Sequence, residues 1–161
     1  MLLAMETPDA CGPKVTVPHV SVWYLGKANQ DEARRVVEAA RGAAHLLKGE
    51  QLTIGGWGTF EGETGVLYWR VEHSTRLREF RRRLEEELPM GTNLPFNPHL
   101  TLVEKVESEE GKKFLNNPPA DVRAIIERQR ITFPIGYLAL WAKNKKRNPS
   151  SPTQRLALIE V

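Results

Sequence analysis

The chain has 161 residues, the length of one ordinary domain, and 40% of them are hydrophobic, which is enough to bury a core. Its net charge of +3 is too mild for a histone-like binder but suits a protein that handles a phosphate-bearing ligand. The single cysteine, Cys11, excludes an internal disulfide and a cysteine-based zinc site. No apolar run approaches the ~18 residues needed to span a bilayer, and "MLLAM" does not resemble a signal peptide. We therefore predict a soluble, monomeric intracellular protein, cytoplasmic or nuclear, without membrane contact.

The first half of the chain alternates β-like and helical patterns. Prolines and a glycine interrupt residues 1–13, so we predict an irregular lead-in there and a single domain over residues 14–161. The first predicted elements are a strand over 14–25 and a helix that begins at the cap candidates Asn29 or Asp31 and ends at Leu47. A strand over 51–54, a glycine-rich connection over 55–65 and a strand over 66–72 follow. A second helix is predicted over 74–88, with its apolar side chains Leu77, Phe80, Leu84 and Leu88 facing the core.

The second half begins with a loop over residues 89–98 and ends in strands. One or two short helices around 108–129 are expected to bury Val122, Ile125 and Ile126. The other predicted elements are strands over 99–103, 130–133, 136–142 and 155–161, with a basic turn over 143–153 between the last two. This order of strands and helices predicts the α+β class.

One five-residue pattern occurs twice, as "PHVSV" at residues 18–22 and as "PHLTL" at residues 98–102. Alternate side chains of a strand share a face. His19 and Ser21 therefore point one way and the valines of that copy the other, and His99 and Thr101 share a face in the second copy. The repetition indicates two lobes built by approximate duplication, with both His–hydroxyl pairs facing one ligand in a central groove.

This combination of side chains suits a phosphodiester. A neutral imidazole can remove a proton from a nucleophile, and an imidazolium can protonate the leaving oxygen. Since the pKa of histidine is about 6.5, both forms are available near neutrality. Hydroxyl groups can donate hydrogen bonds to the non-bridging phosphate oxygens. The scheme requires neither a metal nor a cofactor, and the sequence contains no evident metal-ligand cluster.

The two pentapeptides match the paired His-x-Ser/Thr-x signature of the 2H (two-histidine) phosphoesterase superfamily. The stretch "LTIGGWGTFEGETGVLYWRV", followed by a helix and by "FNPHLTLVEK", resembles the branch that contains the central domain of A-kinase anchor proteins and viral 2′,5′-phosphodiesterases. The resemblance covers residues 14–161. It implies a two-lobed fold in which antiparallel sheets line a central groove with helices outside. By it, His19 and His99 are the catalytic residues, Ser21 and Thr101 bind the substrate phosphate, and no residue binds a metal.

Members of the superfamily carry a strand and a helix before the first motif, whereas only 18 residues precede His19. Two explanations are open. Either "MLLAM" supplies a vestigial strand, or this lobe is trimmed and its edge is covered differently.

The resemblance implies a metal-independent phosphodiesterase, and its branch favours 2′,5′-linked oligoadenylate (2-5A) as the substrate. A 2′,3′-cyclic nucleotide phosphodiesterase and an RNA-end processing enzyme are alternatives with the same four residues. An inactive module that binds RNA or a nucleotide is the alternative of another class. All four motif residues are intact, which argues against an inactive module.

Other notable residues have simpler interpretations. His45 and His73 lack partner motifs and are expected to be structural or exposed. "GGWG" lacks the Gly-Lys-Ser/Thr of a phosphate loop, so turn glycines are expected. The basic residues of the turn at 143–153 are expected to be solvated. Trp57, Phe60 and Phe96 are expected to pack in the core or loops, although one aromatic ring near the groove could stack on a base.

Overall fold

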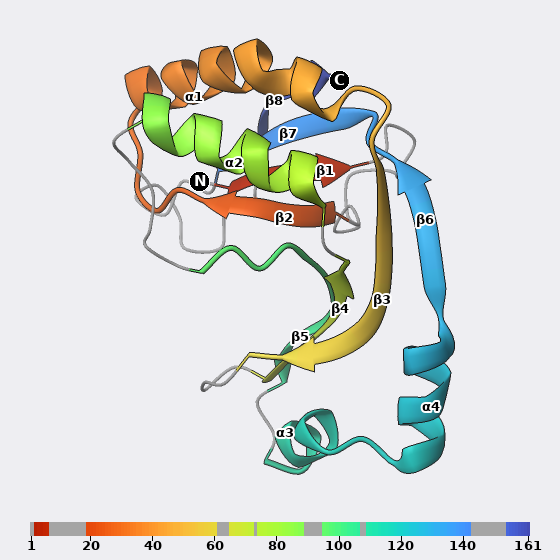
Figure 1. Ribbon diagram of the computed structural model, residues 1–161. Coiled ribbons are helices and arrows are strands. Elements are labelled where there is room, and N and C mark those ends of the chain that lie inside the picture. The colour runs from red at the N-terminus through yellow and green to blue at the C-terminus, as the bar shows by residue number, and fades with distance from the viewer. Residues whose placement is uncertain are drawn as a thin grey trace.

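The computed structural model describes residues 2–6, 19–60, 65–72, 74–88, 95–106, 109–142 and 154–161 (Figure 1). Predictions for residues 14–18, His73 and the basic turn at 143–153 lie outside these ranges. The elements are β1 (Leu2–Glu6), β2 (His19–Tyr24), α1 (Gln30–Ala43), a 3₁₀ turn η1 (Ala44–Leu47), β3 (Gln51–Thr59), β4 (Gly65–Val71), α2 (Thr75–Glu87), β5 (His99–Val106), α3 (Glu109–Asn116), α4 (Ala120–Arg128), β6 (Arg130–Pro134), β7 (Tyr137–Ala142) and β8 (Gln154–Glu160).

The strands form one antiparallel sheet in the order β6-β3-β4-β5-β2-β1-β7-β8. The predicted α+β class is thus confirmed. The sheet divides into two halves, β2-β1-β7-β8 and β5-β4-β3-β6, which meet where β2 pairs with β5. In Figure 1 strands β1, β2 and β7 of the first half run across the view, whereas β3 and β6 run down it. The two lobes therefore share one continuous sheet.

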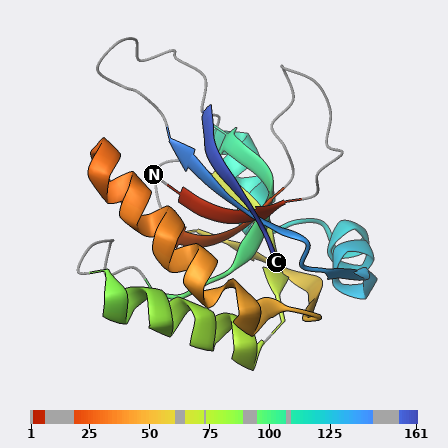
Figure 2. The same ribbon diagram turned by 90° about the horizontal axis from the view of Figure 1, so that it is seen from above.

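Helices α1 and α2 lie side by side over one face of the first half (Figures 1 and 2). Their apolar stripes pack on the strands as predicted, because residues three and four apart share a face of a helix. Fully burying one aliphatic side chain contributes about 1.5–3 kcal/mol. The buried side chains include Val36, Ala40 and Ala43 of α1, Leu77, Phe80 and Leu84 of α2, Leu88 just after α2, and Val20, Leu138 and Leu140 of the strands beneath.

Both helices begin where the sequence predicts. Asn29 is the N-cap of α1: its side chain accepts a hydrogen bond from the Glu32 backbone N–H at 2.9 Å, and the Glu32 carboxylate accepts one from the Asn29 backbone at 2.7 Å. Ser74 caps α2 in the same position and also donates to Glu50. These caps fix the points at which the chain leaves the sheet. No helix in the described ranges is long and apolar enough to cross a membrane.

The N-terminal segment differs from the prediction. Residues 2–6 are not an irregular lead-in but strand β1, which lies between β2 and β7 in the middle of the first half. The first of the two explanations for the short N-terminus is therefore correct. The strand is not evident from the sequence because it is short and its partners are distant along the chain. Its last residue, Glu6, pairs with both His19 and Tyr137.

The predicted glycine-rich connection is also wrong in part, because β3 continues through it to Thr59. Gly56 forms a bulge in the pairing with β4 and has a positive φ of 65°, a conformation that favours glycine. Gly58 is buried. The glycines thus serve a strand rather than a turn.

The predicted buried side of α4 is wrong. Ile125 is 59% exposed, and Val122 and Ile126 are only half-buried. This helix lies at the far end of the second half and packs against β3 (Figure 1). Arg123 lies over the ring of Trp57, with its guanidinium carbon 5.4 Å from the ring centroid. A helix that packs mainly on one strand buries little of its surface, so the apolar pattern of α4 predicts more burial than the structure shows.

Arg81 of α2 is a buried charged residue, with 6% of its surface exposed. Its guanidinium donates to the Val22 carbonyl at 3.0 Å and to Glu85 at 2.6 Å, and it lies 4.6 Å from the ring centroid of Trp23. It also lies 6.0 Å from the ring of Phe96, which precedes β5. Arg81 therefore links α2 to β2 and to the segment that leads into β5.

We expect Arg81→Ala to lower the free energy of unfolding by about 2–3 kcal/mol, because it removes the donor to a buried carbonyl and the packing of the arginine stem. Urea denaturation measures the change. Arg82→Ala is the matched control: its side chain is exposed and pairs with Glu79 and Glu86, so little change is expected. Equal losses in the two variants would contradict this account.

Candidate active site

The two copies of the pentapeptide pair with each other. Strands β2 and β5 are antiparallel, and the paired residues are Val20 with Leu100 and Ser21 with His99. Val20 and Leu100 are the middle residues of the two copies. A local twofold axis therefore passes between them, and the repetition in the sequence becomes a symmetric pair of strands.

The same register, extended by one residue, sets His19 opposite Thr101, just as Ser21 lies opposite His99. Directly opposed residues of an antiparallel pair have Cβ atoms roughly 4.5–5.5 Å apart. The structure thus brings all four predicted residues together, with each histidine opposite the hydroxyl residue of the other copy.

The side chains on the two faces of this strand pair differ in their burial. Val20 and Val22 are 2% and 4% exposed and pack in the core beneath the helices. His19, Ser21 and their counterparts on β5 are half-buried. The alternation predicted from the pentapeptides therefore holds, and the imidazoles and hydroxyls occupy the face that α1 and α2 leave uncovered.

His99 is held in one tautomer. Its Nδ1 lies 2.7 Å from the backbone carbonyl oxygen of Asn97. A carbonyl can only accept, so Nδ1 carries the proton and Nε2 keeps its lone pair. Burial lowers the pKa of His99, the bond to Asn97 opposes this change, and the nearby His19 lowers the pKa further. His99 is thus biased toward the neutral form, with Nε2 as a base.

An aromatic cluster beside His99 was not predicted. Tyr68 of β4 lies with its ring centroid 5.1 Å from that of His99, and Phe60 stacks on Tyr68 at 4.4 Å. The rings of Phe60 and His99 are nearly perpendicular, with their centroids 4.9 Å apart. The Asn97 side chain donates to the Tyr68 hydroxyl at 3.2 Å. Tyr68 and Asn97 are therefore positioning residues for His99.

Gly58 makes room for this cluster. A Cβ atom at this position would lie 2.6 Å from Cζ and Oη of Tyr68, closer than real contacts allow. Gly58 and Tyr68 are paired across β3 and β4, and Tyr68 in turn pairs with Thr101 of β5. Finding these residues from the sequence would require the register of three strands, and the only local signal is the position of Asn97, two residues before His99.

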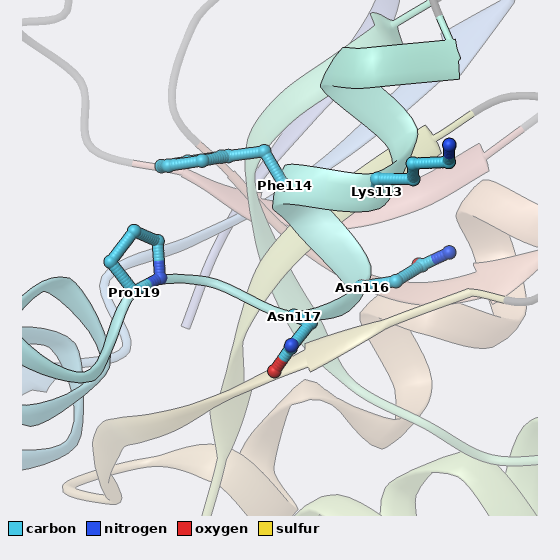
Figure 3. Close-up of a pocket in the computed structure, with 5 residues that line it drawn as sticks. All are labelled: Lys113, Phe114, Asn116, Asn117 and Pro119. Atoms are coloured by element: carbon cyan, nitrogen blue, oxygen red, sulfur yellow. The ribbon is translucent and has the colours of Figure 1, made fainter.

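The remaining candidates lie elsewhere. His45 is exposed in η1, and its Nδ1 is 2.8 Å from the Gly42 carbonyl. A hollow beside the turn from α3 to α4 has no histidine (Figure 3), so we do not assign the site to it. In the part of the chain that the structure describes, His, Cys, Asp and Glu side chains do not gather in threes that could hold a metal ion. The hollow is lined by Lys113, Phe114, Asn116, Asn117 and Pro119.

A model of the 2′-5′ RNA ligase superfamily matches residues 10–147. The chain belongs to this superfamily. The two-histidine phosphoesterase superfamily predicted from the paired motifs is thereby confirmed. Among similar proteins is "Putative phosphoesterase OB1230" of Oceanobacillus iheyensis, which is 27% identical over 94 residues, 58% of this chain and 55% of the relative. The chain thus matches about half the length of that relative.

Solved structures of similar proteins share the fold. TT0787 of Thermus thermophilus has a TM-score of 0.62 at 18% identity, over 99% of this chain and 97% of its own. Escherichia coli LigT, in complexes with NADP+ and with ATP, has a TM-score of 0.58 at 14% identity, over 99% and 96%. These likenesses confirm the predicted two-histidine phosphoesterase fold.

We expect Gly58→Ala to raise the pKa of His99 toward its ordinary value of about 6.5, because the added methyl group displaces Tyr68 and admits water to the imidazole. A pH titration of the histidine resonances by NMR measures the pKa. Gly42→Ala is the control, because no atom lies within 4 Å of the added Cβ, and alanine is favoured over glycine in a helix. An unchanged His99 titration in Gly58→Ala would contradict the positioning role of Tyr68.

Proposed function

We propose that the protein is a metal-independent phosphodiesterase that uses His19 and His99 as a general acid–base pair. One observation carries this proposal: the two motif strands pair with each other, so that an imidazole and a hydroxyl from each lie on one uncovered face. Membership of a phosphoesterase superfamily supports the reaction class. The substrate in this proposal is 2′,5′-linked oligoadenylate.

In the proposed reaction, Nε2 of neutral His99 takes the proton of the ribose 3′-hydroxyl, whose oxygen attacks the adjacent phosphorus. The bond from phosphorus to the 5′-oxygen breaks, and protonated His19 donates its proton to that oxygen. The products are a 2′,3′-cyclic phosphate and a 5′-hydroxyl. The lowered pKa of His99 supports its assignment as the base.

The hydroxyls have a separate role. Ser21 and Thr101 would donate hydrogen bonds to the two non-bridging oxygens as negative charge develops there. Their positions opposite the two histidines support this division, because each hydroxyl lies one strand away from an imidazole.

Three observations favour a 2′,5′-linked adenylate. The reverse of the proposed cleavage joins a 2′,3′-cyclic phosphate to a 5′-hydroxyl through a 2′,5′ linkage, which agrees with the name of the superfamily. Phe60 is 37% exposed beside His99, so its ring offers a surface on which a base can stack. The Escherichia coli structure holds adenine nucleotides, NADP+ and ATP.

The test incubates the protein, in excess EDTA, with matched 2′,5′- and 3′,5′-linked oligoadenylates and with 2′,3′-cyclic AMP. Chromatography of the products then distinguishes the candidate functions. Cleavage of the 2′,5′ linkage alone supports the proposal. Hydrolysis of the cyclic nucleotide alone identifies a 2′,3′-cyclic phosphodiesterase, and removal of terminal nucleotides from the 3′,5′ oligomer identifies an RNA-end processing enzyme. Binding without turnover identifies an inactive module. Activity that EDTA abolishes and added metal restores would refute the metal-independent mechanism.

We expect His19→Ala and His99→Ala each to reduce kcat by about 10²–10⁴-fold, because each removes one proton-transfer group. The double variant should lose far less than the product of the two factors, since both residues serve one transition state. Initial rates give the factors, and circular dichroism verifies folding. Near-normal turnover by either folded variant would rule out the two-histidine mechanism.

Ser21→Ala and Thr101→Val should slow the reaction less than the histidine variants, by up to about 10²–10³-fold, because each removes one hydrogen bond to developing charge. The bell-shaped dependence of rate on pH should persist, because neither change removes a titrating group. Rates measured across the pH range provide the test. Loss of one limb of the profile in a hydroxyl variant would overturn the separation of roles.

A further inference from the structure

Arg70 of β4 is the cross-strand neighbour of His99. The two residues are partners in the pairing of β4 with β5, and Tyr68, two residues before Arg70, is the partner of Thr101. Paired residues of adjacent strands point to the same face of a sheet. The arginine therefore belongs to the face that carries the two histidines, one strand farther into the second half.

The exposed guanidinium of Arg70 has no hydrogen-bond or ion-pair partner among the described residues. The next positions in the same row of the sheet are Gly55 and Arg130. The side chain of Arg130 lies against Gly55 and forms an ion pair with Glu72 at 3.3 Å. One arginine of this row is thus neutralised, and the one beside His99 remains as an uncompensated positive charge.

We infer that Arg70 binds a second phosphate of the substrate, next to the phosphodiester that is cleaved. This assignment rests on the proposed function. The four motif residues account for the two proton transfers and both non-bridging oxygens of the scissile group. Arg70 is one strand away, about 4.8 Å, and carries a long side chain whose planar fork matches a phosphate. It would determine which oligonucleotides are favoured rather than take part in the bond changes.

The test compares 2′,5′-linked diadenylates that differ only in flanking phosphates. The parent A2′p5′A contains only the scissile phosphate, a second substrate adds a 5′-phosphate, and a third adds a phosphate at the opposite end. We expect Arg70→Ala to lower kcat/KM by about 10- to 100-fold for one of the two extended substrates, the size of a lost charge-assisted hydrogen bond. The parent should change less than about threefold, and Arg70→Lys should restore part of the loss.

Arg78→Ala on α2 is the matched control, since Arg78 is exposed and its side chain has no partner among the described residues. Equal losses on all three substrates, or no loss on any, would overturn the assignment. A binding experiment tests Arg70 independently of cleavage. It measures the equilibrium affinity of the same compounds for the His99→Ala variant and for the His99→Ala/Arg70→Ala double variant. Should the wild-type protein cleave none of them, the proposed function fails. If Arg70 binds the added phosphate, that phosphate should raise the affinity only when Arg70 is present. Any other pattern of affinities would refute the role of Arg70, even without cleavage.

Discussion

The site depends on a very short contact, the pairing of β2 with β5 through Val20–Leu100 and Ser21–His99. This pairing joins the two halves of the sheet and sets the strands of the two histidines side by side. Because side chains alternate along a strand, a slip of one residue would turn an aliphatic side chain to the active face and an imidazole to the core. The register must therefore be held by interactions outside the pair itself.

Those interactions lie mainly on the face of the sheet opposite the histidines. Val20 and Val22 lie in the core beneath α1 and α2, and burial of such side chains opposes a slip that would expose them. Arg81 contributes a directional contact, because its bond to the Val22 carbonyl holds the backbone of β2 next to Ser21. The packing of the apolar side chains beneath the helices and the position of the histidines on the other face are thus two consequences of the same register.

Much of this arrangement is predictable from the sequence, because it depends on local patterns. The caps at Asn29 and Ser74 follow from side chains that bond to nearby backbone, and the alternation in the pentapeptides follows from the geometry of a strand. Strand β1 and the continuation of β3 through its glycines are not predictable in this way. Strand β1 is defined by pairing with β2 and with the distant β7, and β3 continues because it pairs with β4 across a bulge at Gly56. The four motif residues could be proposed from a local pattern, whereas the positions of Tyr68 and Arg70 beside His99 follow from the register of β4 with β5.

The symmetry of the motifs does not extend to their surroundings. At equivalent positions of the flanking strands, Thr101 has Tyr68 as its partner and Ser21 has Ala4. Tyr68 supplies a ring that packs beside His99, with the ring centroids 5.1 Å apart. Burial lowers the pKa of His99 and so favours its neutral imidazole. In the proposed reaction this environment favours His99 as the base, with Nε2 as the atom that accepts the proton. Duplication of the motif thus provides two imidazoles, and the strands beside the two copies give them different neighbours.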